Sequence, residues 1–301
     1  MWVQAGHKSR ELLEYIGPSG PLLPDEHSAV ARIALGLEYD GRRFHGWQSQ
    51  KSGVRTVQSA LEAALSKVAA HPVKVVCAGR TDAGVHASGQ VVHFDTEAAR
   101  ELRAWVLGCN TQLPDDVSVS WARVVDDAFH ARFSARARRY HYIILNRAVR
   151  SALHRGRATW HHYQLDAGRM HEAGQVLLGE HDFSAFRAKD CQSKTPFRNV
   201  HHLTVTRSGD WITLDIQANA FLHHMVRNIA GVLIAIGQEQ QTTDWAAQVL
   251  AARDRRQGGV TAPPDGLYLR TVQYDAHWNL PDPDQALGFG RSLTPATRTT
   301  L

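Results

Sequence analysis

Strand and helix patterns alternate along this chain without the regular strand–helix–strand rhythm of a doubly wound parallel sheet. Apolar and polar residues alternate over 31–39, which is a strand pattern. Thr56 is a suitable N-cap for a helix whose apolar positions recur at a spacing of about 3.6 residues. Two later strand patterns, at 200–206 and 211–218, flank a Ser-Gly-Asp turn as in a hairpin. The sequence therefore predicts an α+β fold with a mixed, mainly antiparallel sheet and helices on one side.

The remaining elements are predicted from the same patterns. Strands are expected at 73–77, 90–94, 117–121, 139–145 and 266–274, and helices at 98–107, at 166–178, from about 220 and from about 243. The stretch 1–28 mixes Gly, Pro and charged residues, which predicts a partly disordered extension. The Pro- and Thr-rich stretch 281–301 predicts a loose tail.

The bulk properties limit the class of protein. A chain of 301 residues with 43% hydrophobic residues is long enough to bury a core in one or two domains. No apolar run approaches the roughly 18 residues of a membrane-spanning helix, and the first residues carry no apolar signal core. Cys77, Cys109 and Cys191 are odd in number and far apart, which is typical of thiols in a reducing compartment. We therefore expect a cytoplasmic protein that does not enter a membrane.

The positive charge of the chain is concentrated in one stretch. Residues 128–165 contain no Asp or Glu. Clustered arginines create a positive potential suited to a polyphosphate, and each guanidinium forks onto phosphate oxygens. The stretch therefore favours a nucleic-acid partner, although a solvated surface in an arginine-rich chain is the alternative. Its arginines are Arg132, Arg136, Arg138, Arg139, Arg147, Arg150, Arg155 and Arg157.

A single carboxylate, that of Asp82, stands in a run of small residues at 78–86. Gly79 and Gly84 allow tight turns and a close approach to a ligand. Strand patterns precede and follow the run, and a polar group on a loop held by a sheet is typical of a catalytic site. The structural alternative is an Asx turn, in which the carboxylate only bonds its own backbone.

Several segments together, and in the same order, resemble the motifs of the tRNA pseudouridine synthase A family. The most specific is GRTDAGVH at 79–86. The others are LEYDG at 37–41, GWQSQ at 46–50, FHARFSA at 129–135, RRY at 138–140, DFSAF at 182–186, FLHHMVRN at 221–228 and GLYL at 266–269. Together they span about residues 31–280, and the chain departs from the family mainly in its N-terminal extension.

The resemblance implies a fold and an activity. It implies two ferredoxin-like halves that share the sheet, with the active cleft between them. The half at 29–127 would carry the Asp82 loop, and the half at 128–280 would carry the arginines that bind tRNA. The family isomerises uridines at positions 38, 39 and 40 of the tRNA anticodon stem-loop, uses no cofactor, and forms homodimers whose second subunit helps to hold the tRNA.

The resemblance also assigns catalytic roles. Asp82 matches the catalytic aspartate, which either adds to C6 of the base or attacks or stabilises C1′ of the ribose. An ordinary aspartate is ionised at neutral pH, so it needs no base to act as a nucleophile. Arg227 matches the arginine that pairs with this carboxylate, with a surface cation as the alternative. Tyr140 matches the tyrosine that stacks on the flipped uracil, although a core tyrosine on a strand would fit Tyr142 equally well.

Other candidates would bind substrate without reacting. Leu267 and Leu269 would form an apolar wall of the uracil pocket, unless they only pack in the core. Arg80 would grip the phosphate of the target strand, and Arg136, Arg138 and Arg139 of the basic stretch would bind other phosphates. Trp47 and Gln48 would line the cleft or be buried for structural reasons.

The eighteen histidines do not form a recognisable metal-binding pattern. Doublets occur at 161–162, 201–202 and 223–224, but adjacent side chains diverge on a strand or a helix, and no His-x-x-x-His pair is present. We therefore predict that the protein holds no metal and no other cofactor. Two alternatives stay open: a tRNA-binding protein or chaperone without catalytic activity, and a metal hydrolase built from the histidines.

Overall fold

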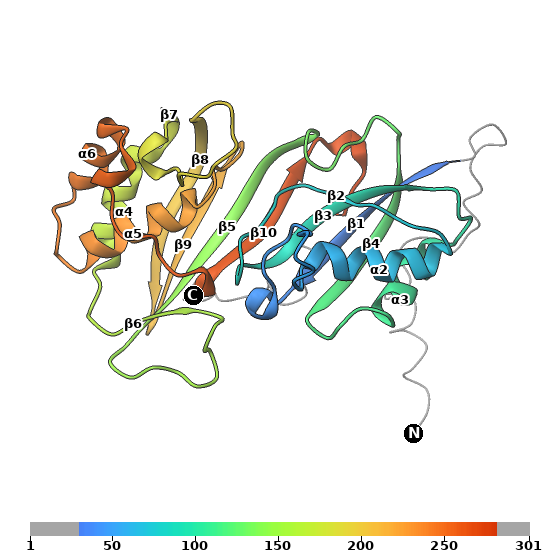
Figure 1. Ribbon diagram of the computed structural model, residues 1–301. Helices are drawn as coiled ribbons and strands as arrows, with labels where there is room; N and C mark the ends of the chain where they lie inside the picture. The colour runs from blue at the N-terminus through green and yellow to red at the C-terminus, as the bar shows by residue number, and fades with distance from the viewer. Residues whose placement is uncertain (1–29, 282–301) are drawn as a thin grey trace, which may run out of the picture.

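The computed structural model describes residues 30–281, and in this range one continuous sheet extends through the molecule (Figure 1). The strand order is β4-β1-β3-β10-β5-β9-β8-β7, with β2 paired to β3 and β6 paired to β5. The expected extension at 1–28 and the expected tail at 281–301, except residue 281 itself, lie outside the described residues. No helix within the described range is both long and apolar enough to cross a membrane.

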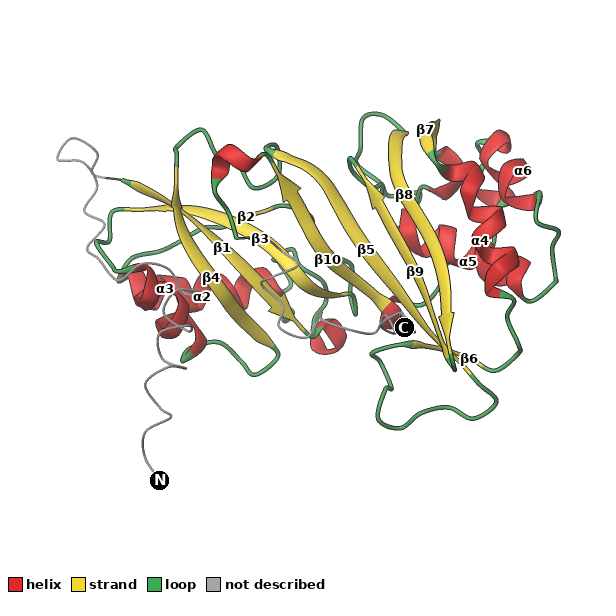
Figure 2. Cartoon of the chain, turned by 180° about the vertical axis from the view of Figure 1, so that it is seen from behind, coloured by secondary structure: helices red, strands yellow, loops and turns green. Residues whose placement is uncertain are grey.

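The strands and α-helices have the following bounds. The strands are β1 (Ala31–Tyr39), β2 (Val76–Cys77), β3 (His86–Thr96), β4 (Val117–Val125), β5 (Ala135–Asn146), β6 (Thr159–His161), β7 (Gly179–Asp182), β8 (Phe197–Ser208), β9 (Trp211–Ala218) and β10 (Leu267–Tyr274). The helices are α2 (Val57–Ala69), α3 (Leu102–Asn110), α4 (Ala167–Gly174), α5 (Met225–Gly237) and α6 (Trp245–Ala252). The view from behind in Figure 2 shows the strands of the first half in front of α2 and α3, whereas α4, α5 and α6 lie at the end of the sheet formed by β8 and β7.

The pairing within the sheet is mainly antiparallel, as the sequence predicts. The parallel pairs are β3 with β10 and β5 with β6. β3 and β10 meet over only a short register, with His86 opposite Tyr268 and Ala87 opposite Leu269. This short parallel contact joins one half of the sheet, built on β4, β1 and β3, to the other, built on β10, β5, β9 and β8. The predicted α+β class is therefore confirmed, whereas the division into units at 29–127 and 128–280 stays a prediction.

The first half of the sheet is covered by α2 and α3. Thr56 is the N-cap of α2, as predicted. Its hydroxyl accepts the N–H of Ser59, and the Ser59 hydroxyl accepts the N–H of Thr56. Leu61 of α2 is fully buried. Trp105 of α3 packs edge-on against Phe94 of β3, with ring centroids 5.1 Å apart. Each large apolar side chain buried in this way stabilises the fold by roughly 1.5–3 kcal/mol.

The second half is covered by α4 and α5, and α6 packs against these two helices. The apolar face of α5 is fully buried, including Ile229, Leu233 and Ile236. The β8–β9 hairpin turns at Gly209, whose φ of +58° favours glycine. The structure therefore confirms the predicted hairpin and the broad apolar face of this helix.

Several predicted boundaries were wrong for local reasons. The helix expected from about 220 begins at Met225, because His224 adopts a left-handed φ of +62° that no helix continues through. The helix expected over 166–178 ends at Gly174 and continues only as a 3-10 turn, before Gly179 turns the chain with φ of +90°. The strand expected at 73–77 is reduced to Val76–Cys77.

Candidate active site

A cavity of about 720 Å³ is lined by residues from both halves of the molecule. One wall is the loop that follows β2, and the opposite walls are the segments 190–193 and 220–226. Tyr140 of β5 and Leu267 of β10 contribute from the sheet. Four arginines and two aspartates line the cavity. Its potential is therefore positive at neutral pH, which suits a polyanion.

The loop at 78–85, which carries Asp82, is held by buried hydrogen bonds. The Nε2 of Gln90 on β3 donates to the Gly79 carbonyl at 2.6 Å. The hydroxyls of Tyr39 on β1 and Thr81 lie 2.9 Å apart in the core. The bond to Tyr39 therefore fixes Thr81 and the loop around it, and the next residue, Asp82, lines the cavity.

Glycines let this loop approach the chain segment that precedes α2. Gly84 has a φ of +80°, which confirms the turn expected there. Gly46, with φ of +86°, lies so close that an added Cβ would stand 2.8 Å from the Thr81 carbonyl. The chain also bends at Gly79, as expected, but without a positive φ. A Cβ at Gly79 would stand 3.8 Å from the Tyr140 hydroxyl, which is an ordinary contact distance, so the loop comes close to Tyr140 at this position.

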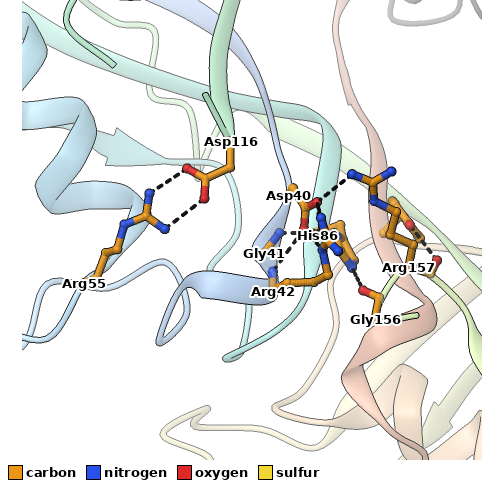
Figure 3. A network of polar contacts seen from close by, with 9 residues as sticks. Asp40, Gly41, Arg42, Arg55, His86, Asp116, Gly156 and Arg157 are labelled. Carbon is orange, nitrogen blue, oxygen red and sulfur yellow. Dashed lines mark hydrogen bonds and ion pairs between the residues drawn. The ribbon is translucent and has the colours of Figure 1, made fainter. Parts of the chain in front are cut away.

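The end of the loop is fixed by His86, the first residue of β3 (Figure 3). Its buried ring stacks on Tyr268 with centroids 4.5 Å apart. Its Nδ1 accepts the Gly41 N–H at 3.1 Å, so its Nε2 donates to the Gly156 carbonyl at 2.9 Å. Burial lowers the pKa of His86, which keeps the ring neutral, as this pattern requires. The network thereby ties the loop to the arginine-rich segment that precedes β6.

Asp82 and Arg227 form an ion pair across the cavity wall. The Nη1 of Arg227 lies 3.2 Å from Oδ2 of Asp82, and the guanidinium is largely buried. Its Nε donates to the Ala262 carbonyl at 2.8 Å, which fixes the direction of the guanidinium. The predicted pairing is therefore present. The Asx-turn alternative is not what the structure shows, because the carboxylate is turned toward α5.

Two histidines that the sequence analysis set aside also face this carboxylate. The Nε2 of His223 lies 3.3 Å from Oδ1 of Asp82, and the Nε2 of His224 lies 3.4 Å from Oδ2. Burial lowers the pKa of His224, which favours its neutral form. The expectation that adjacent histidines diverge was wrong here, because the left-handed backbone of His224 brings both rings together at 4.0 Å. Only that backbone conformation, which the sequence pattern does not reveal, could have identified the pair.

These three residues are also a possible donor set for a metal ion. Ligand atoms of Asp82, His223 and His224 all lie within 4.8 Å of one another. Two imidazoles and one carboxylate suit a divalent transition metal. The same carboxylate already has Arg227 as a cationic partner. The absence of a metal from the working protein stays a prediction.

Tyr140 lies in the cavity wall, and Tyr142 does not. Tyr140 packs edge-on against Phe221 with ring centroids 5.0 Å apart. Burial and, after it, the nearby Asp82 carboxylate raise the pKa of Tyr140, so its hydroxyl stays protonated at neutral pH. Tyr142 is fully buried and bonds Thr159 at 2.6 Å, which is a core role. The core-tyrosine alternative therefore describes Tyr142, whereas Tyr140 lies where a base could contact it.

The other predicted binding residues separate in the same way. Arg80 is exposed at the cavity, and Leu267 lines it. Leu269 is fully buried and is not among the lining residues, so its expected place in the pocket wall was wrong and it packs in the core. Trp47 and Gln48 both line the cavity, although Trp47 is almost completely buried.

The three arginines of β5 do not form a common binding surface. Arg138 is buried, and its Nη atoms donate to the carbonyls of Ala78, Arg132, Ala135 and Asn219. Its expected role as a phosphate-binding residue was wrong, because these carbonyls occupy its guanidinium. Arg136 is paired with Asp275 at 2.6 Å, and Arg139 with Asp215 at 2.5 Å. Alternation along the strand places Arg139 on the opposite face from the other two.

These observations define a class of protein: an α+β enzyme in which one oriented carboxylate faces a positively charged cavity in the middle of a continuous sheet. A family model described as tRNA pseudouridine synthase matches residues 37–134 and 173–275. The chain belongs to this family.

Individual relatives agree with the family assignment. The chain is 60% identical to the tRNA pseudouridine synthase A of Pseudomonas aeruginosa over 255 residues, which cover 85% of this chain and 90% of that protein. It is 64% identical to the protein of the same description from Nitrosococcus oceani over 250 residues, covering 83% and 96%. A third, from Aeromonas hydrophila, is 60% identical over 250 residues, covering 83% and 93%.

Proposed function

We propose that this chain isomerises uridine to pseudouridine at positions 38, 39 and 40 of the tRNA anticodon stem-loop, with Asp82 as the nucleophile and without a metal or organic cofactor. The family assignment supports an isomerase that acts on tRNA. The observation that carries the proposal is the Asp82 carboxylate, held toward the cavity by Arg227 at 3.2 Å.

The reaction explains why a single oriented carboxylate is sufficient. The N1–C1′ glycosidic bond breaks, the uracil rotates, and a C5–C1′ bond forms while C5 loses a proton and N1 gains one. No electrons are exchanged and no water is activated, so neither a hydride carrier nor a Lewis acid has a role. Asp82 adds to C6 of the base, or attacks or stabilises C1′ of the ribose; each route uses the same ionised carboxylate.

The walls of the cavity fit a base that has left its stack. Extruding a base costs a few kcal/mol, and stacking on an aromatic ring returns about 1–3 kcal/mol. Tyr140 and Leu267 supply an aromatic and an apolar wall next to Asp82. Arg80, exposed on the same loop, supplies a cation for the adjoining phosphate. A cytoplasmic homodimer, in which the second subunit helps to hold the tRNA, belongs to the same proposal.

The competing function is tRNA binding without catalysis. A pure binding protein would use the arginines but has no need of a carboxylate in a cavity that attracts phosphate. The test is to incubate the purified protein with an unmodified tRNA transcript and to map pseudouridine by carbodiimide-adduct primer extension. We expect stops that mark pseudouridine at positions 38, 39 and 40 wherever these are uridines, and none with Asp82→Asn. Binding of the transcript without any pseudouridine would establish the competing function.

A further inference from the structure

An aromatic ring stands exposed beside the cavity, at the turn that leads into β5. Phe133 is 75% exposed, and its neighbour Arg132 lines the cavity. Single exposed apolar residues are common on protein surfaces, so exposure alone does not indicate a site. What distinguishes Phe133 is how firmly its surroundings hold it.

The ring of Phe133 is supported from one side by a histidine. The ring of His130 stacks against it with centroids 4.2 Å apart and planes inclined by 28°. The Nδ1 of His130 accepts the N–H groups of Arg132 and Phe133, each at 3.2 Å. Ser134 closes the turn, because its N–H donates to the His130 carbonyl at 2.8 Å. The hydrogen bonds of the turn and the His130 ring therefore hold Phe133 from one side and leave its other side exposed, and such support before binding lowers the entropy cost of binding a ligand.

The same turn is connected to the loop at 78–85 through buried Arg138. One Nη2 atom donates to the Arg132 carbonyl at 2.6 Å and to the Ala78 carbonyl at 2.9 Å. The position of Phe133 relative to the Asp82 carboxylate is thus set by the core rather than by a mobile loop.

Charge and shape together indicate the ligand. The guanidinium of Arg132 lies 5.5 Å from the Phe133 ring centroid, and it faces the cavity that also exposes Arg80. Aromatic rings interspersed with guanidinium groups are typical of surfaces that bind single-stranded nucleic acid, in which bases stack and phosphates are paired. A base inside a helix has both faces covered, so the ligand must offer an unpaired or newly uncovered base.

We propose that Phe133 is a stacking platform for the nucleotide adjacent to the target uridine, and that Arg132 contacts the phosphate between the two. When the uridine flips into the cavity, its neighbour loses a stacking partner, and the Phe133 ring replaces it. This inference rests on the proposed function, because it takes tRNA as the substrate.

The test compares four substitutions by filter-binding affinity for an unmodified tRNA transcript. Phe133→Ala should weaken affinity by roughly 5- to 150-fold, as expected for the loss of one stacked base. Phe133→Leu, which keeps an apolar side chain without a ring, should resemble Phe133→Ala, whereas Phe133→Trp should resemble the parent. Tyr163→Ala is the matched control, since Tyr163 is 56% exposed and also lies against a histidine ring, that of His162, with centroids 3.8 Å apart and planes tilted by 42°. Tyr163 lies near the other end of the 12-residue strand β5, roughly 35 Å away, and should be neutral.

An abasic nucleotide identifies the partner base. The base is removed from the nucleotide on the 5′ side of the target in one tRNA and on the 3′ side in another. One of these two tRNAs should bind the parent protein more weakly than the intact tRNA does. The Phe133→Ala protein should bind that same tRNA and the intact tRNA with equal affinity. Additive losses on both sides would overturn the proposal, as would equal affinity of Phe133→Leu and the parent. A Phe133→Ala protein that changes its oligomeric state by sedimentation, with unchanged tRNA affinity, would assign the ring to a protein interface and also overturn it. Pseudouridine formation by the parent protein is measured separately. Its result tests the proposed function independently of the affinities measured for the Phe133 variants.

Discussion

The guanidinium of Arg227 and the carboxylate of Asp82 lie 3.2 Å apart, although the two residues are 145 positions apart in the sequence. One comes from a loop on the first half of the sheet and the other from the first turn of α5 on the second half. The ion pair therefore orients the carboxylate only when both halves are in place. A bond from Arg227 Nε to the Ala262 carbonyl, at 2.8 Å, holds the guanidinium itself.

Removing this guanidinium should slow the reaction without abolishing it. Arg227→Ala leaves the carboxylate present but poorly directed, so we expect single-turnover pseudouridine formation to fall roughly 10²-fold. Arg227→Lys should lie between this variant and the parent, because an ammonium group keeps the charge but does not fork between Asp82 and Ala262. A rate for Arg227→Ala within twofold of the parent, in a folded protein, would show that the pair does not orient Asp82.

Two arginines of the cavity should have different roles, with Arg80 binding phosphate and Arg138 holding the fold. Arg80→Ala should reduce the slope of log K against log salt for tRNA binding by about 0.7–0.9, the value for one lost phosphate contact. Arg138→Ala should instead lower the free energy of unfolding by roughly 3 kcal/mol or more, because several buried carbonyls lose their donor. Urea denaturation and salt-dependent filter binding measure the two effects. If the Arg138→Ala protein has the stability of the parent but a reduced salt-dependence slope for tRNA binding, Arg138 binds phosphate after all.

How far the sequence predicts this molecule depends on the range of the interactions involved. The α+β class, the Thr56 cap and the β8–β9 hairpin follow from local patterns, which the sequence contains directly. The burial of Arg138 does not, because the carbonyls that hold it come from segments on both sides of the cavity. The His223–His224 pair was missed because one left-handed residue redirects both rings. Short-range patterns carry no information on either arrangement.

Stability should fall in mild acid because of one buried histidine. His93 is 4% exposed, and its Nδ1 accepts the Ala131 N–H at 3.1 Å. Burial, helped by Arg32, lowers its pKa from 6.5 to about 4. Because the unfolded chain binds the proton on His93 more readily than the folded chain does, protonation favours unfolding. The contribution of neutral His93 to the free energy of unfolding is therefore fully present above about pH 6.5 and is lost as the pH falls through about 4. The expected loss is up to about 3 kcal/mol, measured by urea denaturation at a series of pH values. In His93→Gln this part of the pH dependence should disappear; an identical profile in both proteins would contradict the assignment.

Chelation separates the proposed isomerase from a metal enzyme. Turnover should be unchanged in excess EDTA, provided that monovalent salt keeps the tRNA folded, because no step needs a Lewis acid. Added zinc should inhibit, since Asp82, His223 and His224 offer ligand atoms within 4.8 Å of one another, and EDTA should reverse the inhibition. Activity that is lost in EDTA and restored by zinc would instead support the metal-enzyme alternative.

Asp82 itself provides the most direct test of the mechanism. Asp82→Asn keeps the size of the side chain and most of its hydrogen bonding but removes the negative charge that makes the oxygen a nucleophile. The chemical step should therefore lose roughly 10⁴-fold or more. The affinity for tRNA should stay the same or improve, because the carboxylate repels nearby phosphate. Asp190→Asn is the matched control, since Asp190 lines the same cavity and has no assigned role; its single-turnover rate should equal that of the parent. If Asp82→Asn forms pseudouridine within tenfold of the parental rate, Asp82 is not the nucleophile.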